Sequence, residues 1–317
     1  METVFIDGSA GTAGLRIRER LASRRDISLR ILPEELRKDP AAREDALRTS
    51  DVAFLCLPDA AAREAAAFAD GARTIVIDTS TAHRTDPAWE YGFPELAGRR
   101  ARIAAARRIA NPGCHASGFI ALVQPLIAAG VLPPSARLCC FSLTGYSGGG
   151  KKMIAQYDEA LVGSRREEFL GGRQYALGQT HKHLPEMAVV CGLDAPPVFS
   201  PVVVPHLCGM ETCVQLFKDA TSGGLEAIRA CYRDLYSGPG GVVRYRSAPP
   251  EDGFLSSSSF AGGDGMEVSA WGGEGRIVLV ARFDNLGKGA CGAAIQNMNI
   301  ALGREETLGL SVPDAVQ

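Results

Sequence analysis

The sequence predicts two domains: an α/β dinucleotide-binding domain of the Rossmann type, and an α+β domain with a largely antiparallel sheet. The first 150 residues alternate short apolar runs with amphipathic or alanine-rich segments, as β-α-β units do. After about residue 130, strand-like runs follow one another with few helical segments between them, which is typical of an α+β domain. The length of 317 residues suits two such domains.

The elements of the first domain follow from apolar periodicity. We expect strands at 4–6, 27–32, 52–57 and 74–78, and helices at 15–23, 40–47 and 59–68. The uninterrupted apolar run 52–57 is typical of a parallel strand covered on both faces. Pro40 suits the start of a helix because its missing N–H is not needed there. Asp59 is expected to cap the helix that it begins.

The second domain contains mainly strand patterns. We expect strands at 137–143, 198–204, 212–217, 242–246, 267–271 and 276–283, and helices at 225–236 and 290–302. The last helix is expected to return to the first domain. The expected division is therefore 1–113 with 286–317 for dinucleotide binding, and 114–285 for catalysis and oligomerisation.

Composition excludes several classes of protein. The net charge is −2, so the chain has no need of a polyanionic partner, and nucleic-acid binding is not expected. It shows no secretion signal and no apolar run near the ~20 residues that span a bilayer, so we expect a cytoplasmic protein without a membrane anchor. Nine cysteines without regular spacing do not indicate a disulfide framework. The 36 glycines are typical of loops that approach a ligand closely.

A glycine-rich loop between the first strand and the first helix indicates a phosphate site. Its residues are Gly8, Ser9, Ala10, Gly11, Thr12, Ala13 and Gly14, with glycines at every third position. Such glycines bring backbone N–H groups close to a phosphate, and the following helix adds its dipole. After the second strand, Arg37 and Lys38 could hold the 2′-phosphate of NADP. The alternative is that these two cations belong to a solvated loop.

One cysteine has a chemical setting. Cys114 follows Asn111-Pro112-Gly113 and precedes the apolar run 119–126. A thiol at a helix N-terminus has a lowered pKa, and the thiolate is the form needed for covalent catalysis. We interpret the other eight as small apolar packing residues: Cys56, Cys139, Cys140, Cys191, Cys208, Cys213, Cys231 and Cys291.

Two histidines next to Glu186 are candidate acid–base groups. Pro185 disfavours a helical conformation at Leu184, and in an extended segment His181 and His183 would share a face. One of them could transfer protons beside Cys114. A metal pair is the alternative, but no third clustered ligand is evident, so no metal is expected.

Two further glycine-rich segments remain. Residues 144–152 form a glycine nest followed by Lys151 and Lys152, which favours an anion site over a flexible linker. Residues 284–292 run into the last helix. Their small residues allow close approach of a ligand or a loop, or simply begin that helix.

Taken together, these motifs resemble the short type of N-acetyl-γ-glutamyl-phosphate reductase, within the aspartate-semialdehyde dehydrogenase-like group. The resemblance extends nearly from end to end, over residues 5–15, 79–84, 91–96, 111–114, 145–151, 181–186 and 284–289. It implies NADPH-dependent reduction of N-acetyl-L-glutamyl 5-phosphate to the 5-semialdehyde and phosphate, in arginine biosynthesis. It also implies a thioester on Cys114, a small-molecule acyl-phosphate substrate, and a homodimer or homotetramer.

The resemblance also assigns residues to sites. It makes one of His181 and His183 the acid–base group, without deciding which. To the NADP(H)-binding loop and the two cations it adds Pro58, Ser80, Asn285 and Gly287. The substrate or phosphate site would be lined by Arg84, Asn111, Ser147, Gly148, Lys151 and Glu186.

The chain departs from the family pattern at two places. Cys114 is followed by His115, where another aromatic residue is typical, and His115 either perturbs the thiolate or packs. No arginine occurs near 206–208, where one anionic contact is expected; Lys151, Lys152 or His206 would have to replace it. A related semialdehyde dehydrogenase acting on another acyl phosphate is therefore the alternative function. A non-catalytic dinucleotide sensor on the same scaffold is a third interpretation.

Overall fold

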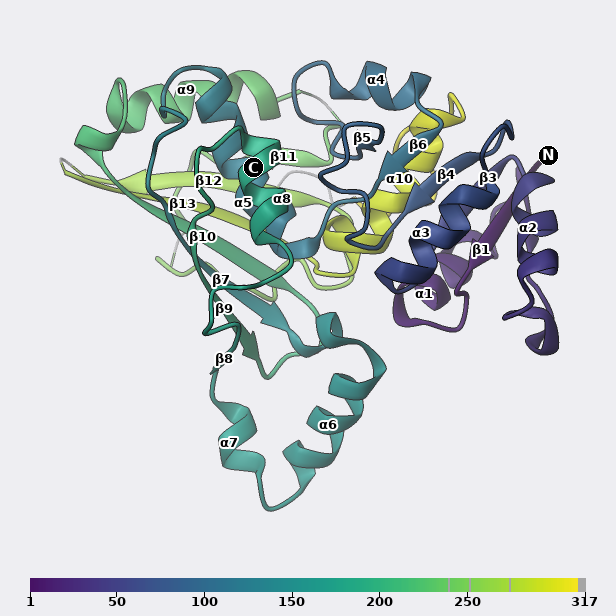
Figure 1. Ribbon diagram of the computed structural model, residues 1–317. Coiled ribbons are helices and arrows are strands. Elements are labelled where there is room, and N and C mark those ends of the chain that lie inside the picture. The colour runs from purple at the N-terminus through teal and green to yellow at the C-terminus, as the bar shows by residue number, and fades with distance from the viewer. Residues whose placement is uncertain (239, 251, 274, 313–317) are drawn as a thin grey trace. The chain divides into compact units, whose positions relative to one another are not determined.

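The computed structural model describes residues 1–312 except 239, 251 and 274, and these form two compact units (Figure 1). Unit 1 holds Met1–Pro94, Gly98–Gly113 and Ala290–Leu310, and unit 2 holds Glu95–Ala97, Cys114–Gly289 and the described residues after Leu310. By these contacts the chain enters unit 1 again at Ala290. Residues 313–317 of the expected first domain lie outside the described part of the chain.

Unit 1 is built on a six-stranded sheet in which all neighbours are parallel, in the order β2-β1-β3-β4-β6-β5. Its strands are β1 (Glu2–Asp7), β2 (Ile27–Arg30), β3 (Val52–Leu55), β4 (Ile75–Asp78), β5 (Glu90–Tyr91) and β6 (Arg108–Ala110). Its helices are α1 (Thr12–Leu21), α2 (Pro40–Arg48), α3 (Asp59–Phe68), α4 (Arg99–Ala105) and α10 (Gly292–Ala301), with a 3₁₀ turn, η1 (Glu34–Leu36). The predicted Rossmann-type domain is confirmed.

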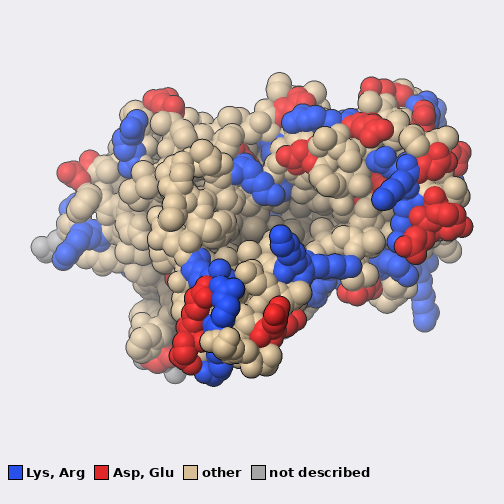
Figure 2. Space-filling model, turned by 60° about the horizontal axis from the view of Figure 1, so that its bottom comes forward, with Lys and Arg blue, Asp and Glu red and all other residues tan. Residues whose placement is uncertain are grey.

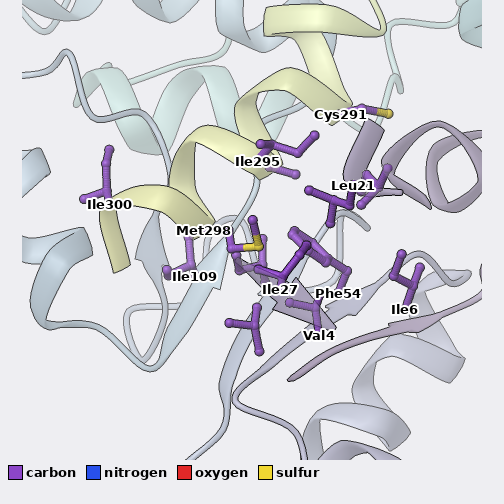
Figure 3. Packing of buried hydrophobic residues seen from close by; sticks show 14 of the residues in the cluster. Val4, Ile6, Leu21, Ile27, Phe54, Ile109, Cys291, Ile295, Met298 and Ile300 are labelled. Carbon is purple, nitrogen blue, oxygen red and sulfur yellow. The ribbon is translucent and has the colours of Figure 1, made fainter. Parts of the chain in front are cut away.

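Alternate residues of the central strands enter two separate cores. Val4 and Phe54 lie in a cluster with residues of α1 and α10, whereas Phe5 and Leu55 lie in a cluster with residues of α2 and α3. Figure 3 shows the first cluster, in which Ile295 and Met298 of α10 lie beside the strand residues. Helices therefore cover both faces of the parallel sheet, as its continuous apolar strands require.

Helix capping agrees with the sequence at α2 and differs at α3. The Asp39 carboxylate accepts a hydrogen bond from Ala42 N at 3.2 Å, and Pro40 follows it. The predicted cap of α3 was wrong. Pro58 is the N-cap, and the Asp59 carboxylate instead accepts hydrogen bonds from the backbone N–H and the hydroxyl of Thr81.

Unit 2 contains a seven-stranded sheet in the order β11-β12-β13-β10-β7-β9-β8. Four of its six neighbouring pairs are antiparallel, which confirms the predicted largely antiparallel sheet. Its strands are β7 (Cys139–Gly145), β8 (Arg173–Gln174), β9 (Val198–Val204), β10 (Met210–Phe217), β11 (Val243–Tyr245), β12 (Met266–Gly272) and β13 (Arg276–Phe283).

The helices of unit 2 are α5 (Cys114–Ala128), α6 (Gly150–Val162), α7 (Arg166–Leu170), α8 (Leu184–Cys191) and α9 (Gly224–Tyr236). Short turns are η2 (Tyr146–Gly149), η3 (Lys218–Ala220) and η4 (Gly287–Cys291), of which η4 is π-helical. The sequence had predicted few helices here, and α6, α7 and α8 were missed. Helix α6 packs Tyr157 and Ala160 against Phe169 of α7.

Helix α5 is the central element of unit 2. It packs against β10 and β13 and against α8 and α9. Pro125 lies inside it and has no N–H to donate to the Ala121 carbonyl one turn earlier. The Tyr236 hydroxyl of α9 donates to that carbonyl at 2.9 Å, and Tyr232 donates to the Leu122 carbonyl at 2.6 Å. Buried carbonyls near the proline are therefore satisfied from a neighbouring helix.

The other face of this sheet carries exposed apolar side chains. Cys140 and Ser142 of β7 are buried on the α5 side, so Phe141 between them points the other way and is 39% exposed. By strand register, Val198 and Phe217 lie on that same face, and they are 56% and 67% exposed. We call this surface the open face of the sheet.

No described helix is both long and apolar enough to cross a membrane. Basic and acidic side chains both occur on the face drawn in Figure 2, in keeping with the small net charge.

Candidate active site

The glycine-rich loop of unit 1 has the geometry of a phosphate-binding turn. Gly8 has φ +85°, and a Cβ at this position would lie 2.2 Å from the Cys56 carbonyl oxygen. A Cβ at Gly14 would lie 2.4 Å from the Gly8 carbonyl oxygen. Helix α1 begins directly after Gly11, and no side chain caps it. Its first N–H groups are therefore available to an anion.

A cavity of about 240 Å³ adjoins this loop. Gly8, Ser9, Ala10, Arg37 and Lys38 line it, and no acidic side chain from the end of β2 does so among the described residues. Arg37 and Lys38 are thereby placed beside the loop, as the sequence predicted for a 2′-phosphate site. The remaining predicted loop residues, Thr12, Ala13 and Gly14, start helix α1.

A buried ion pair forms the wall of this cavity. Arg43 of α2 donates to the Asp7 carboxylate from Nη2 at 3.0 Å and from Nε at 3.1 Å, and both side chains are over 90% buried. Burial raises the pKa of Asp7, against the opposing effect of Arg43. The charge of Arg43 is paired with Asp7. The other cations that line the cavity, among the described residues, are Arg37 and Lys38.

Three of the four other predicted residues of unit 1 have well-defined hydrogen-bond partners. Ser80 donates to Asp78 at 2.7 Å, and Asp78 also contacts Nδ1 of His83. Arg84 donates from Nε to the Asn111 carbonyl at 2.9 Å. The Asn111 amide donates to the Ala290 carbonyl and accepts from Asn297. Pro58 is exposed at the start of α3.

The predicted nucleophile begins the central helix of unit 2. Cys114 is the first residue of α5 and is partly exposed. Gly289 packs directly against it, because a Cβ at Gly289 would lie only 3.0 Å from the Cys114 Cβ. A helix N-terminus favours the thiolate form of a cysteine.

The two predicted histidines converge, although not by the predicted route. Their ring centroids are 4.7 Å apart, but His183 is helical and Leu184 and Pro185 open helix α8, so the expected extended segment was wrong. Proline is tolerated there because the first turn of a helix needs no N–H from it. Nδ1 of His181 accepts the His183 backbone N–H at 3.1 Å. Neutral His181 therefore carries its proton on Nε2.

A third histidine and a tyrosine complete this cluster. Sequence reasoning left open whether His115 perturbs the thiolate or packs, and it assigned no role to Tyr175. His115 is 2% exposed, and its ring centroid lies 5.7 Å from that of His181 and 5.7 Å from that of His183. Nε2 of His115 lies 2.8 Å from the Tyr175 hydroxyl. Burial, and then the nearby His181, lower the pKa of His115 to about 3, so the ring is neutral at physiological pH.

The glycine-rich segment 144–152, which was expected to bind an anion, contacts the loop that precedes η4 in unit 2. The Asn285 amide donates to Ser147 Oγ at 2.9 Å and accepts from Gly209 N at 3.0 Å. Asn285, predicted to bind the cofactor, thus orients Ser147, whose hydroxyl lies 3.4 Å from Cys208 Sγ. Gly148 and Lys151 are exposed, Gly287 is buried in η4, and Glu186 is buried in the first turn of α8.

The three proposed substitutes for the missing arginine are not equivalent. His206 donates to or accepts from Ser257 at 3.0 Å, and burial lowers its pKa, which favours the neutral ring. Lys151 and Lys152 are exposed in the first turn of α6. The lysines, rather than His206, can supply a full positive charge.

All nine cysteines are free. Cys140, Cys191 and Cys291 are buried as predicted, whereas Cys139 is exposed on the open face, so its interpretation as a packing residue was wrong. Within the described residues, no three His, Cys, Asp or Glu side chains are grouped to hold a metal ion.

Known proteins resemble the whole chain. Residues 1–106 match the family model of the semialdehyde dehydrogenase NAD binding domain, and residues 114–285 match that of the semialdehyde dehydrogenase dimerisation domain. A Brucella anthropi protein named N-acetyl-gamma-glutamyl-phosphate reductase is 45% identical over 95% of this chain and 98% of its own length. The protein of that name from Brucella ovis is 44% identical over 95% of this chain and 99% of its own length.

Solved structures share the fold. Aspartate semialdehyde dehydrogenase II from Vibrio cholerae has a TM-score of 0.69 at 18% identity, over 96% of this chain and 98% of that one. The aspartate semialdehyde dehydrogenase from Francisella tularensis has a TM-score of 0.71 at 14% identity, over 95% of this chain and 99% of that one.

The contact between Gly289 and Cys114 can be tested through the thiol itself. We expect Gly289→Ala to slow alkylation of Cys114 by iodoacetamide roughly tenfold, the effect of about 1.4 kcal/mol, because the added methyl group must displace the cysteine. Peptide mapping by mass spectrometry separates Cys114 from the exposed Cys139. Gly171→Ala is the control, since its Cβ would meet only the Glu168 carbonyl oxygen, at 3.8 Å. Equal alkylation rates in both variants would contradict the prediction.

Proposed function

Because this chain belongs to the semialdehyde dehydrogenase family, and within it to the N-acetyl-γ-glutamyl-phosphate reductases, we propose that it reduces N-acetyl-L-glutamyl 5-phosphate with NADPH. The products would be N-acetyl-L-glutamate 5-semialdehyde and phosphate, a step of arginine biosynthesis. The observation that carries this proposal is a cysteine at the N-terminus of a buried helix, in the same unit as a pair of converging histidines, in a chain 45% identical to a reductase of that name.

Cys114 would act first. Its thiolate attacks the acyl carbon of the substrate, the bond from that carbon to the phosphate oxygen breaks, and inorganic phosphate leaves a thioester on Sγ. The partly exposed position of Cys114 allows this attack, and the start of helix α5 favours the thiolate. When bound, the nicotinamide supplies the hydride that reduces the thioester carbon.

The residues of unit 1 fit a phosphorylated dinucleotide. The uncapped start of α1 offers its first N–H groups to a pyrophosphate, and Gly8 and Gly14 permit the tight turn before it, since a Cβ at either position would collide with the backbone. Arg37 and Lys38 line the adjoining cavity and would hold the 2′-phosphate, which favours NADPH over NADH.

The histidine pair would stabilise charge on the acyl oxygen. His181 accepts the backbone N–H of His183 at Nδ1, so its neutral ring carries the proton on Nε2 and can donate it. A donor at this ring lowers the energy of the oxyanion that forms when the thioester is reduced, before the aldehyde and the Cys114 thiolate separate. We therefore assign His181 the donor role and retain His183 as its partner in proton transfer.

The substrate contacts predicted from the sequence remain part of the proposal. Ser147 and Gly148 of η2 and Lys151 in the first turn of α6 would bind phosphate. Arg84, Asn111 and Glu186 would complete the substrate site. One observation favours a second candidate function. The 206–208 segment offers Cys208 and a neutral His206 where an arginine is expected, which would suit an acyl phosphate with one anionic group fewer.

We also infer that the protein is a homodimer or homotetramer of a reducing compartment such as the cytoplasm. The open face exposes Phe141, Val198 and Phe217, and the domain that carries it matches a dimerisation domain. Free cysteines throughout the chain are compatible with a reducing environment.

The activity is tested in the reverse direction. Wild-type protein with N-acetyl-glutamate semialdehyde, phosphate and NADP should produce NADPH, followed at 340 nm, only when all three are present. Cys114→Ser should lower kcat at least ~10³-fold, because a serine hydroxyl is not ionised at neutral pH. A panel of other semialdehydes decides between the two candidates. Turnover of another member without turnover of this substrate would overturn the proposal in favour of the second function.

The preference for NADPH depends on two cations. Replacing Arg37 and Lys38 together by Ala should raise the Kd of NADPH at least ~100-fold, since hydrogen bonds to a charged group contribute about 1.5–3 kcal/mol each. The Kd of NADH should change little. Fluorescence titration measures both constants, with Arg25→Ala as the control because Arg25 does not line the cavity. Equal weakening of both cofactors would assign the cations another role.

The open face is tested by oligomeric state. Phe141→Glu should convert the oligomer to a smaller species in light scattering after size exclusion, because burying a carboxylate in an apolar interface is costly. Val162→Glu, 88% exposed at the end of α6, is the matched control and should leave the mass unchanged. An unchanged mass of folded Phe141→Glu would place the interface elsewhere.

A further inference from the structure

His115 lies on helix α5, and its ring contacts both members of the histidine pair. It directly follows Cys114 on α5, and both of its ring nitrogens have partners. Nδ1 lies 2.8 Å from Ser142 Oγ of β7, and Nε2 lies 2.8 Å from the Tyr175 hydroxyl. Since the ring is neutral, one nitrogen donates a hydrogen bond and the other accepts one.

The hydrogen bonds of His115 extend through Ser142 to a second hydroxyl group. Ser142 Oγ is also 3.1 Å from Thr212 Oγ1 of β10, so Thr212, Ser142, His115 and Tyr175 form one connected row. In one direction of this row, Thr212 donates to Ser142, Ser142 to Nδ1, and Nε2 to Tyr175. The Tyr175 hydrogen then remains available to another acceptor. In the other direction, Nε2 accepts that hydrogen and the phenol presents only its oxygen.

Tyr175 contacts the residue that directly follows Cys114, and this position favours one of the two directions. Burial, and then the nearby Cys114 thiolate, raise the pKa of Tyr175, so the phenol keeps its proton while a negative charge is present on Cys114. That charge attracts the phenol hydrogen and favours the direction in which Nε2 donates to Tyr175. The other titratable rings that contact His115 are His181 and His183.

We propose that His115 is a positioning residue for the proposed reaction: it donates from Nε2 to Tyr175 and thereby directs the Tyr175 hydroxyl as a hydrogen-bond donor toward the Cys114 thiolate. The row is neutral, and Thr212, Ser142 and His115 are buried, so it orients a donor without bringing a full charge to the nucleophile. The proposal rests on the function assigned to Cys114, and its principal test measures the thiol alone.

The experiment follows alkylation of Cys114 by iodoacetamide as a function of pH, without substrate or cofactor, in wild type, His115→Phe and Tyr175→Phe. His115→Phe keeps a planar ring and removes both nitrogens. Both variants should shift the alkylation midpoint upward by about one pH unit, the loss expected for one hydrogen bond to a charged group. The double variant should shift it no further than the larger single shift, because His115 acts through Tyr175. Tyr157→Phe removes a buried phenol hydroxyl of α6 that lies outside the row and has no hydrogen-bond partner among the described residues, so it should leave the midpoint unchanged.

Steady-state kinetics supply the second measurement. Each single variant should lower kcat about tenfold with KM within a factor of about three, and the double variant should match the slower single variant. The proposal would be overturned if the midpoint shifts of the two single variants added up in the double variant, or if Tyr175→Phe kept the wild-type midpoint. The Tyr175→Phe measurement remains decisive even if His115→Phe does not fold. Because alkylation needs no substrate, an altered midpoint in a protein that fails the reductase assay supports the positioning role and rejects only the proposed substrate.

Discussion

The site in unit 2 depends on how closely helix α5 packs on its sheet. At Gly118 a Cβ would lie 2.4 Å from Thr212 Oγ1 and 2.9 Å from the Phe283 ring, so only glycine permits this approach. One turn earlier, the same helix carries Cys114 and His115. The close contact brings His115 within hydrogen-bond distance of Ser142 on β7, beside Thr212 on β10. A wider separation would leave these hydroxyls buried without the histidine, at a cost of about 1–3 kcal/mol for each unsatisfied group.

The close packing of α5 also explains the conformation of the rest of that helix. Its length is almost wholly buried, so every carbonyl that the backbone cannot satisfy needs a partner from another element. Pro125 creates such a carbonyl at Ala121, and the Tyr236 hydroxyl of α9 satisfies it. The catalytic end of the helix is thus held from the sheet side by Ser142 and Thr212, and its other end by tyrosines of α9. A thiol on a helix fixed at both ends keeps its position while its charge changes during the reaction.

The sequence allowed the fold class and the isolated groups to be predicted, but not the contacts among them. Apolar runs such as 52–57 gave the strands of unit 1 because a parallel strand buried on both faces has an unambiguous pattern. Helix α6 was missed although Met153, Tyr157 and Ala160 follow helical spacing, because the glycines before it indicated a loop. The partnership of His115 with Tyr175 joins residues 60 positions apart and depends on the register of β7, β9 and β10, which local patterns do not contain. The histidine pair was found because its members are neighbours in sequence, and only its backbone conformation was mispredicted.

The two units bind negative charge by different means, and the difference follows from what each charge must do. In unit 1 the phosphate groups of a cofactor are permanent charges, and the partly exposed Arg37 and the exposed Lys38 can pair with them at little desolvation cost. Cys114 must instead form a thiolate that still attacks carbon, and nucleophilicity falls as the pKa of a thiol falls. A buried cation beside it would favour the thiolate strongly and weaken its attack. His115 is neutral and Tyr175 keeps its proton, so they offer a directed donor in place of a charge, which stabilises the thiolate moderately and leaves it reactive.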